Sequence, residues 1–335
     1  MIAISTERSK WVKRLARLVI VAATLPMAAL VANPLAASGA TLSSPASSPE
    51  ASSIIAHRLA PFASSVANHF VWTVTAASQD GSCSEINNGA TNGAAKALVF
   101  AQPVYNPGGV PAAGDPSTVP VGVYYDTKTS EWCIFSEADS GPPALGTAFN
   151  VLVIPHATPT AFRVTATSNS TKQNAMFMSK AATTSHPNAV LLVQNVDINT
   201  PFVNHPLGVA YKPSPGKWGI FQTDGGTMPT GATFEVLVGS ASSGGTSIIK
   251  TATSSNSKNG ALYIKSPATN GSPNSEVFAT ENFDPHGIGG LHVGINNVVQ
   301  MIAWYDTTDG WASIFNSDSS NLRVGSSYNL LLFGN

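Results

Sequence analysis

The sequence predicts an all-β protein in which three tandem modules, each a small antiparallel β-sandwich or barrel, follow a signal peptide and a linker. Three observations predict this class. The chain of 335 residues repeats itself three times from Phe70 onward. Each copy contains apolar runs of about four to six residues separated by Pro, Gly, Asn and Ser, as expected for strands and turns. None of these runs has the periodicity of a helix.

The N-terminal region has the features of a secretory signal peptide. Basic residues precede an apolar run over residues 18–32, and residues 38–40 (Ser-Gly-Ala) fit a small-residue cleavage site. The alternative is a transmembrane anchor, but the run contains Pro26 and has about 15 residues, fewer than the roughly 20 that cross a bilayer. We therefore expect residues 1–40 to be removed and the protein to be secreted, or to lie at the cell surface or in the periplasm, with no membrane span in the mature chain. Residues 41–66, rich in Ser, Ala and Pro, are predicted to form a linker.

Two segments recur in every copy and set the boundaries. The closing glycines Gly146, Gly231 and Gly325 lie 85 and 94 residues apart. Solenoid and propeller repeats are shorter, at about 20 to 50 residues, whereas a copy of this length can fold as a small domain. We expect β-modules over residues 67–156, 157–240 and 241–335. The recurring segments are WCIF (132–135), WGIF (218–221) and WASIF (311–315, one residue longer), then GTAFNVLV (146–153), GATFEVLV (231–238) and GSSYNLLL (325–332).

The second copy shows the strand pattern most clearly. Residues 207–211 and 218–222, joined by a loop of turn-forming residues, are predicted to form a β-hairpin. Large side chains alternate with Gly208 and Ala210, so the strand is covered on both faces, which favours a sandwich or barrel. The Gly/Ser-rich residues 239–247 are expected to act as a flexible linker before the third module. The six predicted strands are 162–167, 175–179, 189–194, 207–211, 218–222 and 233–238.

The second copy resembles a repeat family of secreted, mostly bacterial proteins. The residues that carry the resemblance are HPLGVAY (205–211), KWGIFQTD (217–224) and MPTGATF (228–234). The family pattern is N-H-P-I-G-V-W-Y, followed by K-W-A-I-F-N-Q-D and M-P-x-G-A-x-F-N-V. The first copy lacks the His-Pro pair, and the third departs in the hairpin and in the Met-Pro turn. The resemblance implies a β-rich extracellular module of uncharacterised function and supplies no catalytic residue.

The composition excludes several classes of function. Charged residues make up 10% of the chain, against about 25% in average proteins. Basic and acidic residues number 17 and 18, whereas nucleic-acid binding requires a basic patch or stripe, so no nucleic-acid partner is expected. The sequence contains no serine-hydrolase, zinc-peptidase, P-loop or EF-hand motif. These observations favour a non-catalytic protein with no cofactor and no metal.

Loops and recurring acids supply the candidate binding residues. The loops over residues 105–119, 197–205 and 283–297 differ in length on an otherwise repeated frame, which suits binding loops. Aromatic side chains beside them could stack on a sugar ring. An Asp follows each Ile-Phe strand, where it either caps a turn or accepts a hydrogen bond from a ligand. The candidates are Tyr105, Asn106, Asp139, Phe202, His205, Asp224, Phe283, His286 and Asp318.

Several residues have a functional interpretation beside a simpler one. His286 and His292 could bind a metal, but exposed loop histidines are favoured. Glu137 and Asp139 could form the carboxylate pair of a glycosidase, although acids at a turn are more often solvated. The tryptophans Trp132, Trp218 and Trp311 fit a core better than a binding platform. The alternative function is an exported hydrolase in the third module, which a cluster of Glu276, Glu281, Asp284 and His286 around a deep pocket would support.

The two cysteines allow a sharper prediction. By alignment of the copies, Cys83 corresponds to Ala175 and Ala261, and Cys133 corresponds to Gly219 and to either Ala312 or Ser313. Since both positions are Cys in one copy and small in the others, we predict a Cys83–Cys133 disulfide, formed after export into an oxidising compartment. Two buried thiols are the alternative, and a Cα separation beyond about 7 Å would exclude the bridge.

These patterns together favour an exported, non-catalytic, multivalent binding or surface-structural protein. Three tethered modules gain avidity on a repetitive ligand, and the abundant Asn, Ser, Thr and Gly match hydroxyl-rich ligands. We expect the partner to be a polysaccharide or a cell-surface component. A module that only presents a surface is the competing interpretation.

Overall fold

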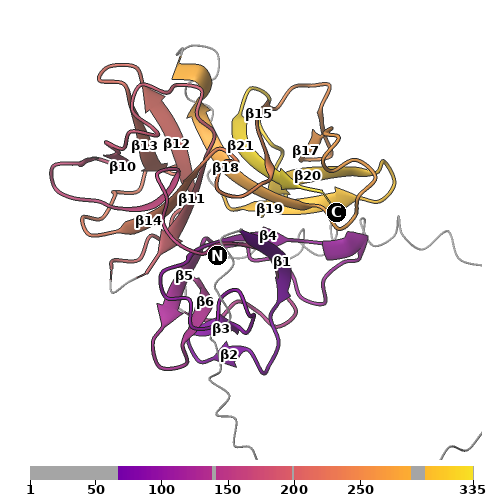
Figure 1. Ribbon diagram of the computed structural model, residues 1–335. Helices are drawn as coiled ribbons and strands as arrows, with labels where there is room; N and C mark the ends of the chain where they lie inside the picture. The colour runs from indigo at the N-terminus through magenta and orange to yellow at the C-terminus, as the bar shows by residue number, and fades with distance from the viewer. Residues whose placement is uncertain (1–66, 138–140, 198–199, 288–298, 335) are drawn as a thin grey trace, which may run out of the picture. The chain divides into compact units, whose positions relative to one another are not determined.

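The computed structural model describes residues 67–137, 141–197, 200–287 and 299–334. These residues form 21 β-strands and two short 3₁₀ turns, so the all-β class predicted from the sequence is confirmed (Figure 1). The predicted signal peptide and linker, residues 1–66, lie outside the described residues, as do Asp139 and His292. Within the described ranges, no helix is long and apolar enough to cross a membrane.

The strands form three seven-stranded sheets. Sheet A has the order β1 (Asn68–Thr73), β7 (Ala148–Ile154), β4 (Leu98–Val104), β19 (Met301–Asp306), β20 (Trp311–Asn316), β17 (Ala261–Ile264), β16 (Ser257–Lys258). Sheet B has the order β2 (Gln79–Asp80), β3 (Cys83–Ile86), β6 (Glu131–Ser136), β5 (Val121–Asp126), β11 (Leu191–Val196), β14 (Thr233–Val238), β8 (Ala161–Thr165). Sheet C has the order β15 (Thr246–Thr251), β21 (Ser327–Phe333), β18 (Glu276–Asp284), β12 (Leu207–Lys212), β13 (Lys217–Gln222), β10 (Ala175–Phe177), β9 (Thr171–Lys172). The 3₁₀ turns are η1 (Pro107–Gly109) and η2 (Pro285–Gly287).

Every sheet is shared by two repeats, which we number 1 to 3 over residues 67–156, 157–240 and 241–335. Each repeat gives four strands to one sheet and three to another. Sheet B combines four strands of repeat 1 with three of repeat 2, sheet C continues from repeat 2 to repeat 3, and sheet A returns from repeat 3 to repeat 1. Figure 1 shows this closure where β4 lies beside β19. The repeats therefore form a closed cycle.

The strand pairs that join the repeats are parallel, which the sequence did not predict. Within a repeat, the described pairs are antiparallel. The three junctions pair β5 with β11, β12 with β18, and β4 with β19 in parallel. Apolar alternation within one strand does not reveal whether its neighbour comes from the same repeat, so these junctions were not visible in the sequence.

Each repeat has its own core between its three-strand part and its four-strand part, as in a small sandwich. In repeat 1, Trp132 packs with Ile134 and Phe149, and in repeat 2, Trp218 packs with Ile220 and Phe234. Both tryptophans are 0% exposed, which confirms the core interpretation for these two. A further cluster takes Phe100, Leu192 and Phe278 from the three repeats. It buries apolar surface between the repeats, so their association gains hydrophobic stabilisation.

Polar side chains at equivalent positions also link the repeats in a cycle. The backbone N–H of Ala101 donates to Gln194 Oε1, that of Val193 to Thr280 Oγ1, and that of Ala279 to Gln102 Oε1, each at 3.1 Å. Each bond crosses from one repeat to another. Because these groups are buried or nearly so, breaking one link leaves an unpaired polar group at an apolar interface, which is costly.

The second repeat follows the predicted strand pattern closely. All six predicted runs contain a strand, and the predicted hairpin is β12 paired with β13. The segment expected to be a flexible linker instead forms a turn. Ser243 N–H donates to Ser240 O (3.0 Å), and Ser242 Oγ bonds Thr160 Oγ1 (2.6 Å). The turn holds β15 close to repeat 2.

The Cys83–Cys133 disulfide is confirmed. The two Cα atoms lie 5.6 Å apart, in paired strands β3 and β6. The register also settles the position left open by the sequence alignment, because Cys133 is equivalent to Gly219 and Ser313. Ala312 therefore takes the place of Trp132 and Trp218, and Trp311 lies one position outside it.

Candidate functional site

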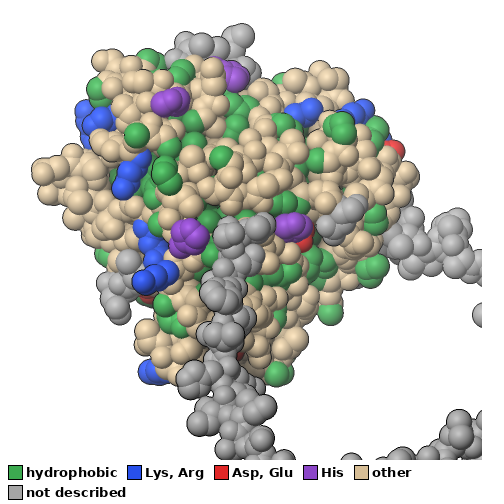
Figure 2. All heavy atoms as spheres, in the orientation of Figure 1, with side chains coloured by type: hydrophobic (Ala, Val, Ile, Leu, Met, Phe, Trp, Pro, Cys, Tyr) green, Lys and Arg blue, Asp and Glu red, His purple; other side chains and the backbone are tan. Residues whose placement is uncertain are grey.

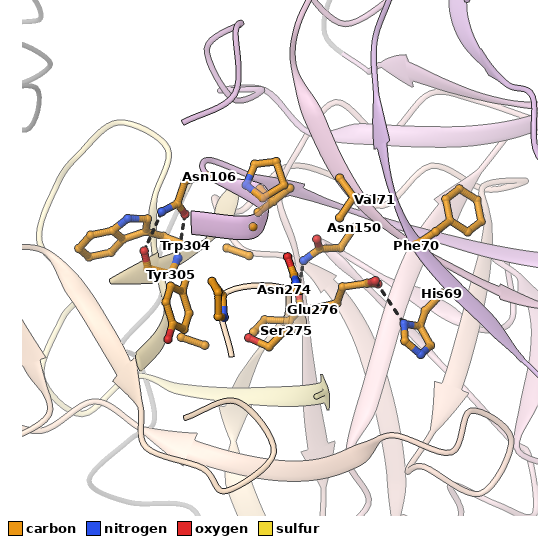
Figure 3. Close-up of a pocket in the computed structure, with 17 residues that line it drawn as sticks. His69, Phe70, Val71, Asn106, Asn150, Asn274, Ser275, Glu276, Trp304 and Tyr305 are labelled. Atoms are coloured by element: carbon orange, nitrogen blue, oxygen red, sulfur yellow. Dashed lines mark hydrogen bonds and ion pairs between the residues drawn. The ribbon is translucent and has the colours of Figure 1, made fainter. Parts of the chain in front are cut away.

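A pocket of about 300 Å³ lies where repeat 3 meets repeat 1. One wall is the face of sheet A formed by β1, β7, β4, β19 and β20, and the other is the segment that leads into β18. Figure 3 shows side chains from both walls around the pocket. Its volume is at the lower end of the range of about 300–1,000 Å³ for small-molecule sites. The pocket is lined chiefly by His69, Val71, Asn150, Glu276, Tyr305 and Ala312.

Two asparagines of repeat 1 fix the inner wall by bonding the backbone of repeat 3. Asn106 Nδ2 donates to Tyr305 O (2.7 Å), and its Oδ1 accepts from Tyr305 N–H (2.8 Å). Asn150 Nδ2 donates to Val277 O (3.1 Å). Both asparagines are buried. Because all three bonds join repeat 1 to repeat 3, they fix the shape of the pocket without a ligand.

Glu276 gives the pocket an acidic side chain at depth. It is 4% exposed, and one carboxylate oxygen lies 3.2 Å from His69 Nδ1. Burial raises the pKa of Glu276, and the bond with His69 opposes that shift. Among the described residues, the second oxygen, Oε2, has no hydrogen-bond partner, and the same holds for the buried Ser275 Oγ. Both atoms belong to pocket residues.

The strand registers explain why this junction is open. Tyr125 pairs with Trp132, Tyr211 with Trp218, and Tyr305 with Ala312. Two junctions are therefore filled by a buried indole, whereas the third has only a methyl group at this position. The pocket exists because Ala312 leaves that space empty.

A second difference between equivalent positions of the repeats opens the rim of the pocket. Val71, Arg163 and Ile249 occupy equivalent positions, since each pairs with the buried polar residue of the adjacent closing strand. Arg163 lies over the Trp132 ring at 5.5 Å and donates to Ala97 O (2.6 Å). Val71 is too short to bridge in this way and is 39% exposed.

The candidate residues from the sequence do not converge on this pocket. Of the candidates that the structure describes, only Asn106 lines it, and Asn106 acts there through the backbone of Tyr305. Tyr105 packs edge-on against Phe315 (6.3 Å between ring centroids). Phe202, 47% exposed, packs against Phe135 (5.6 Å).

The remaining candidates make local contacts. His205 Nδ1 and Asp224 Oδ2 lie 2.6 Å apart. His286 bonds Asn188 (2.8 Å), and Phe283 packs against Phe221 (5.7 Å). Asp318 accepts from Ser320 N–H (2.8 Å), as a turn-capping acid does.

Glu276 and Glu281, two members of the proposed hydrolase cluster, do not lie in one pocket. Glu276 lines the junction pocket, whereas Glu281 lines a separate pocket of about 70 Å³ that also contains His205. Glu137, the described member of the carboxylate pair considered for a glycosidase, is buried, so the favoured interpretation of a solvated acid is wrong for it. It accepts from Val203 N–H (3.1 Å) and bonds the Asn195 amide, and burial raises its pKa to about 7. Its contacts join repeat 1 to repeat 2, so it has a structural role.

One acidic group has the spacing of cation ligands. Carboxylate oxygens of Asp80, Glu85 and Asp126 lie within 4.8 Å of one another. These residues are exposed or half-buried, and Glu85 Oε1 is a buried atom with no hydrogen-bond partner among the described residues.

Sequence reasoning missed His69 and Ala312, and it gave no binding role to Asn150, which stands out only as a polar residue that recurs with Asn329. The signal for Ala312 was present, because counting from Tyr305-Asp306, which corresponds to Tyr125-Asp126, places Ala312 where Trp132 stands. Aligning the copies on their tryptophans instead places Trp311 at that position, which hides the difference between Ala312 and Trp132.

The fold and the pocket define a cyclic three-repeat β-protein with one open junction. The chain belongs to the family of a domain of unknown function, DUF7452, which matches residues 60–153, 122–238 and 208–332. Successive matches overlap over 122–153 and 208–238, the segments that carry the hairpin and closing strand. No curated protein and no solved structure matches the chain significantly.

Proposed function

We propose that this protein is an exported, non-catalytic binding protein whose ligand site is the junction pocket. One observation carries the proposal: of the three equivalent junctions, only that of repeats 3 and 1 combines, within the described residues, a vacated core position with a buried, partly unpaired acid. A packing defect alone would leave an apolar void. Glu276 stands where the equivalent residues are Leu98 and Val190, so its burial has a cost that a ligand can offset.

On this proposal the protein has one ligand site, whereas three tethered modules would each bring an equal site. In the other two junctions the space is filled by Trp132 with Arg163, or by Trp218. The repeats then act as a frame that holds one site rigidly, which favours binding because little order is lost when the ligand enters.

The ligand source that we propose is a polysaccharide or another cell-surface component. The chain carries few charges, and Figure 2 shows few Lys, Arg, Asp or Glu side chains on the visible face. A surface with few charges that is rich in Asn, Ser and Thr offers hydrogen bonds to hydroxyl groups, and an excess of acidic over basic residues does not attract phosphate or nucleic acid.

Retention on immobilised polysaccharides and cell-surface glycans tests the proposal. The full chain lacking residues 1–40 should bind at least one of them, and Ala312→Trp, which fills the pocket, should weaken retention by about tenfold or more. Equal retention of both proteins would overturn the pocket as the site. Absence of retention on every surface would overturn the proposed ligand source.

A further inference from the structure

We propose that the junction pocket binds an aromatic ring of indole size, carried by a ligand that also has a hydrogen-bond donor. The inference rests on the proposed function in one respect, that the pocket is the ligand site. A polysaccharide carries no indole ring, so the inference narrows the proposed source to cell-surface components other than glycans.

The shape of the vacated space favours an indole. Trp132 packs edge-on against Tyr125 with ring centroids 5.9 Å apart, and Trp218 packs against Tyr211 at 5.5 Å. Tyr305 is the equivalent tyrosine in the pocket. A planar ring that enters beside Ala312 could therefore make with Tyr305 the same edge-to-face contact that the protein's own indoles make with Tyr125 and Tyr211, and such contacts stabilise aromatic pairs.

The polar groups favour a ring that carries a donor. Both buried indoles donate Nε1–H to a backbone carbonyl, Trp132 to Ala94 O and Trp218 to His186 O, each at 2.9 Å. Two residues that line the pocket, Glu276 and Ser275, have a buried oxygen (Oε2 and Oγ) with no hydrogen-bond partner among the described residues. A hydrocarbon ring would leave both unpaired, whereas an amine or hydroxyl donor would satisfy the carboxylate.

The rim allows entry from solvent. Val71 is 39% exposed at the position where Arg163 covers Trp132, and Pro273 and Asn274 on the opposite rim are exposed. An acidic wall disfavours anions. The class of ligand is thus a neutral or cationic indole-type molecule, of which tryptamine is the simplest probe with a flexible donor.

Isothermal titration calorimetry of the full chain lacking residues 1–40 tests the inference with three probes: indole, tryptamine and N-acetylglucosamine. We expect saturable one-site binding of indole and of tryptamine, with tryptamine about tenfold tighter. Glu276→Gln should remove most of that preference while indole still binds. Ala312→Trp should weaken both by at least about tenfold.

A second filling variant keeps the test decisive. Val71→Arg, which imitates Arg163 of repeat 2, should close the same pocket from the rim, so it replaces Ala312→Trp if that variant fails to fold. Failure of the wild type to bind both aromatic probes would overturn the inference, and so would equal binding by a folded filling variant. If the wild type binds only N-acetylglucosamine, the inference fails and the proposed function stands.

Discussion

Replacing Arg163 with isoleucine should destabilise the protein by about 3 kcal/mol, because it leaves the buried carboxylate of Glu235 without its charged partner. Glu235 is 0% exposed, and its Oε1 lies 2.8 Å from Arg163 Nη2. Burial raises the pKa of Glu235 to about 7 even with Arg163 present. Without the guanidinium, the carboxyl must remain charged in the interior or take up a proton, and both reduce stability. Urea unfolding at pH 8 measures the loss.

The other repeats supply the matched control. Ile249 faces Asn329 at the equivalent position of repeat 3, and Asn329 Nδ2 donates to Leu191 O (3.1 Å). The double variant Arg163→Ile with Glu235→Asn reproduces that pair, so it should recover most of the lost stability. A single variant that loses less than about 1 kcal/mol, the value of a surface pair, would contradict the role given to Arg163.

Removing the disulfide should have an effect of similar size. Cys83 and Cys133 are separated by 50 residues, and closing such a loop restricts the unfolded chain by about 4 kcal/mol in the entropic model. The variant Cys83→Ala with Cys133→Ser places at these sites the residue types found at Ala261 and Ser313. It should fold and lose about 4 kcal/mol of unfolding free energy.

Reductant provides the control for that experiment. Dithiothreitol should lower the urea midpoint of the wild type towards that of the double variant and leave the variant unchanged. An identical midpoint for oxidised wild type and variant would show that the bridge contributes nothing to stability.

Local patterns predicted the strands and turns within a repeat well. Apolar runs such as 218–222 and the turn-rich loop before them gave the hairpin, because strand alternation and turn chemistry are properties of neighbouring residues. The disulfide was predictable for a similar reason, since repeats place small residues where Cys83 and Cys133 stand. These features depend on one repeat at a time.

The junctions and the pocket depend on two repeats at once, which is why the sequence did not reveal them. Gln102 and Gln194 are of one type and Thr280 is of another, although each accepts a hydrogen bond from the backbone of a neighbouring repeat in the same way. His69 and Glu276 are 207 residues apart in the chain. No spacing rule relates such residues until the sheets are known to be shared.

The cyclic arrangement changes what a repeat contributes to function. A tethered module would bring its own site, whereas here each repeat completes sheets begun by its neighbours. The duplicated frame allows one junction to lose its tryptophan while the other two keep theirs, since their cores remain filled. Stability and binding can then reside in different junctions of the same fold.

Scanning calorimetry of the wild type and Ala312→Trp tests most directly the claim that the pocket is an empty core position between repeats sharing sheets. We expect one cooperative transition in each protein, with equal calorimetric and van't Hoff enthalpies. Filling a cavity typically adds about 0.5 to 2 kcal/mol, so the whole transition of Ala312→Trp should move upward by about 2 to 4 °C per kcal/mol. Two outcomes would contradict this claim. One is separate transitions of which only one moves in Ala312→Trp, and the other is a transition of Ala312→Trp at a lower temperature than that of the wild type.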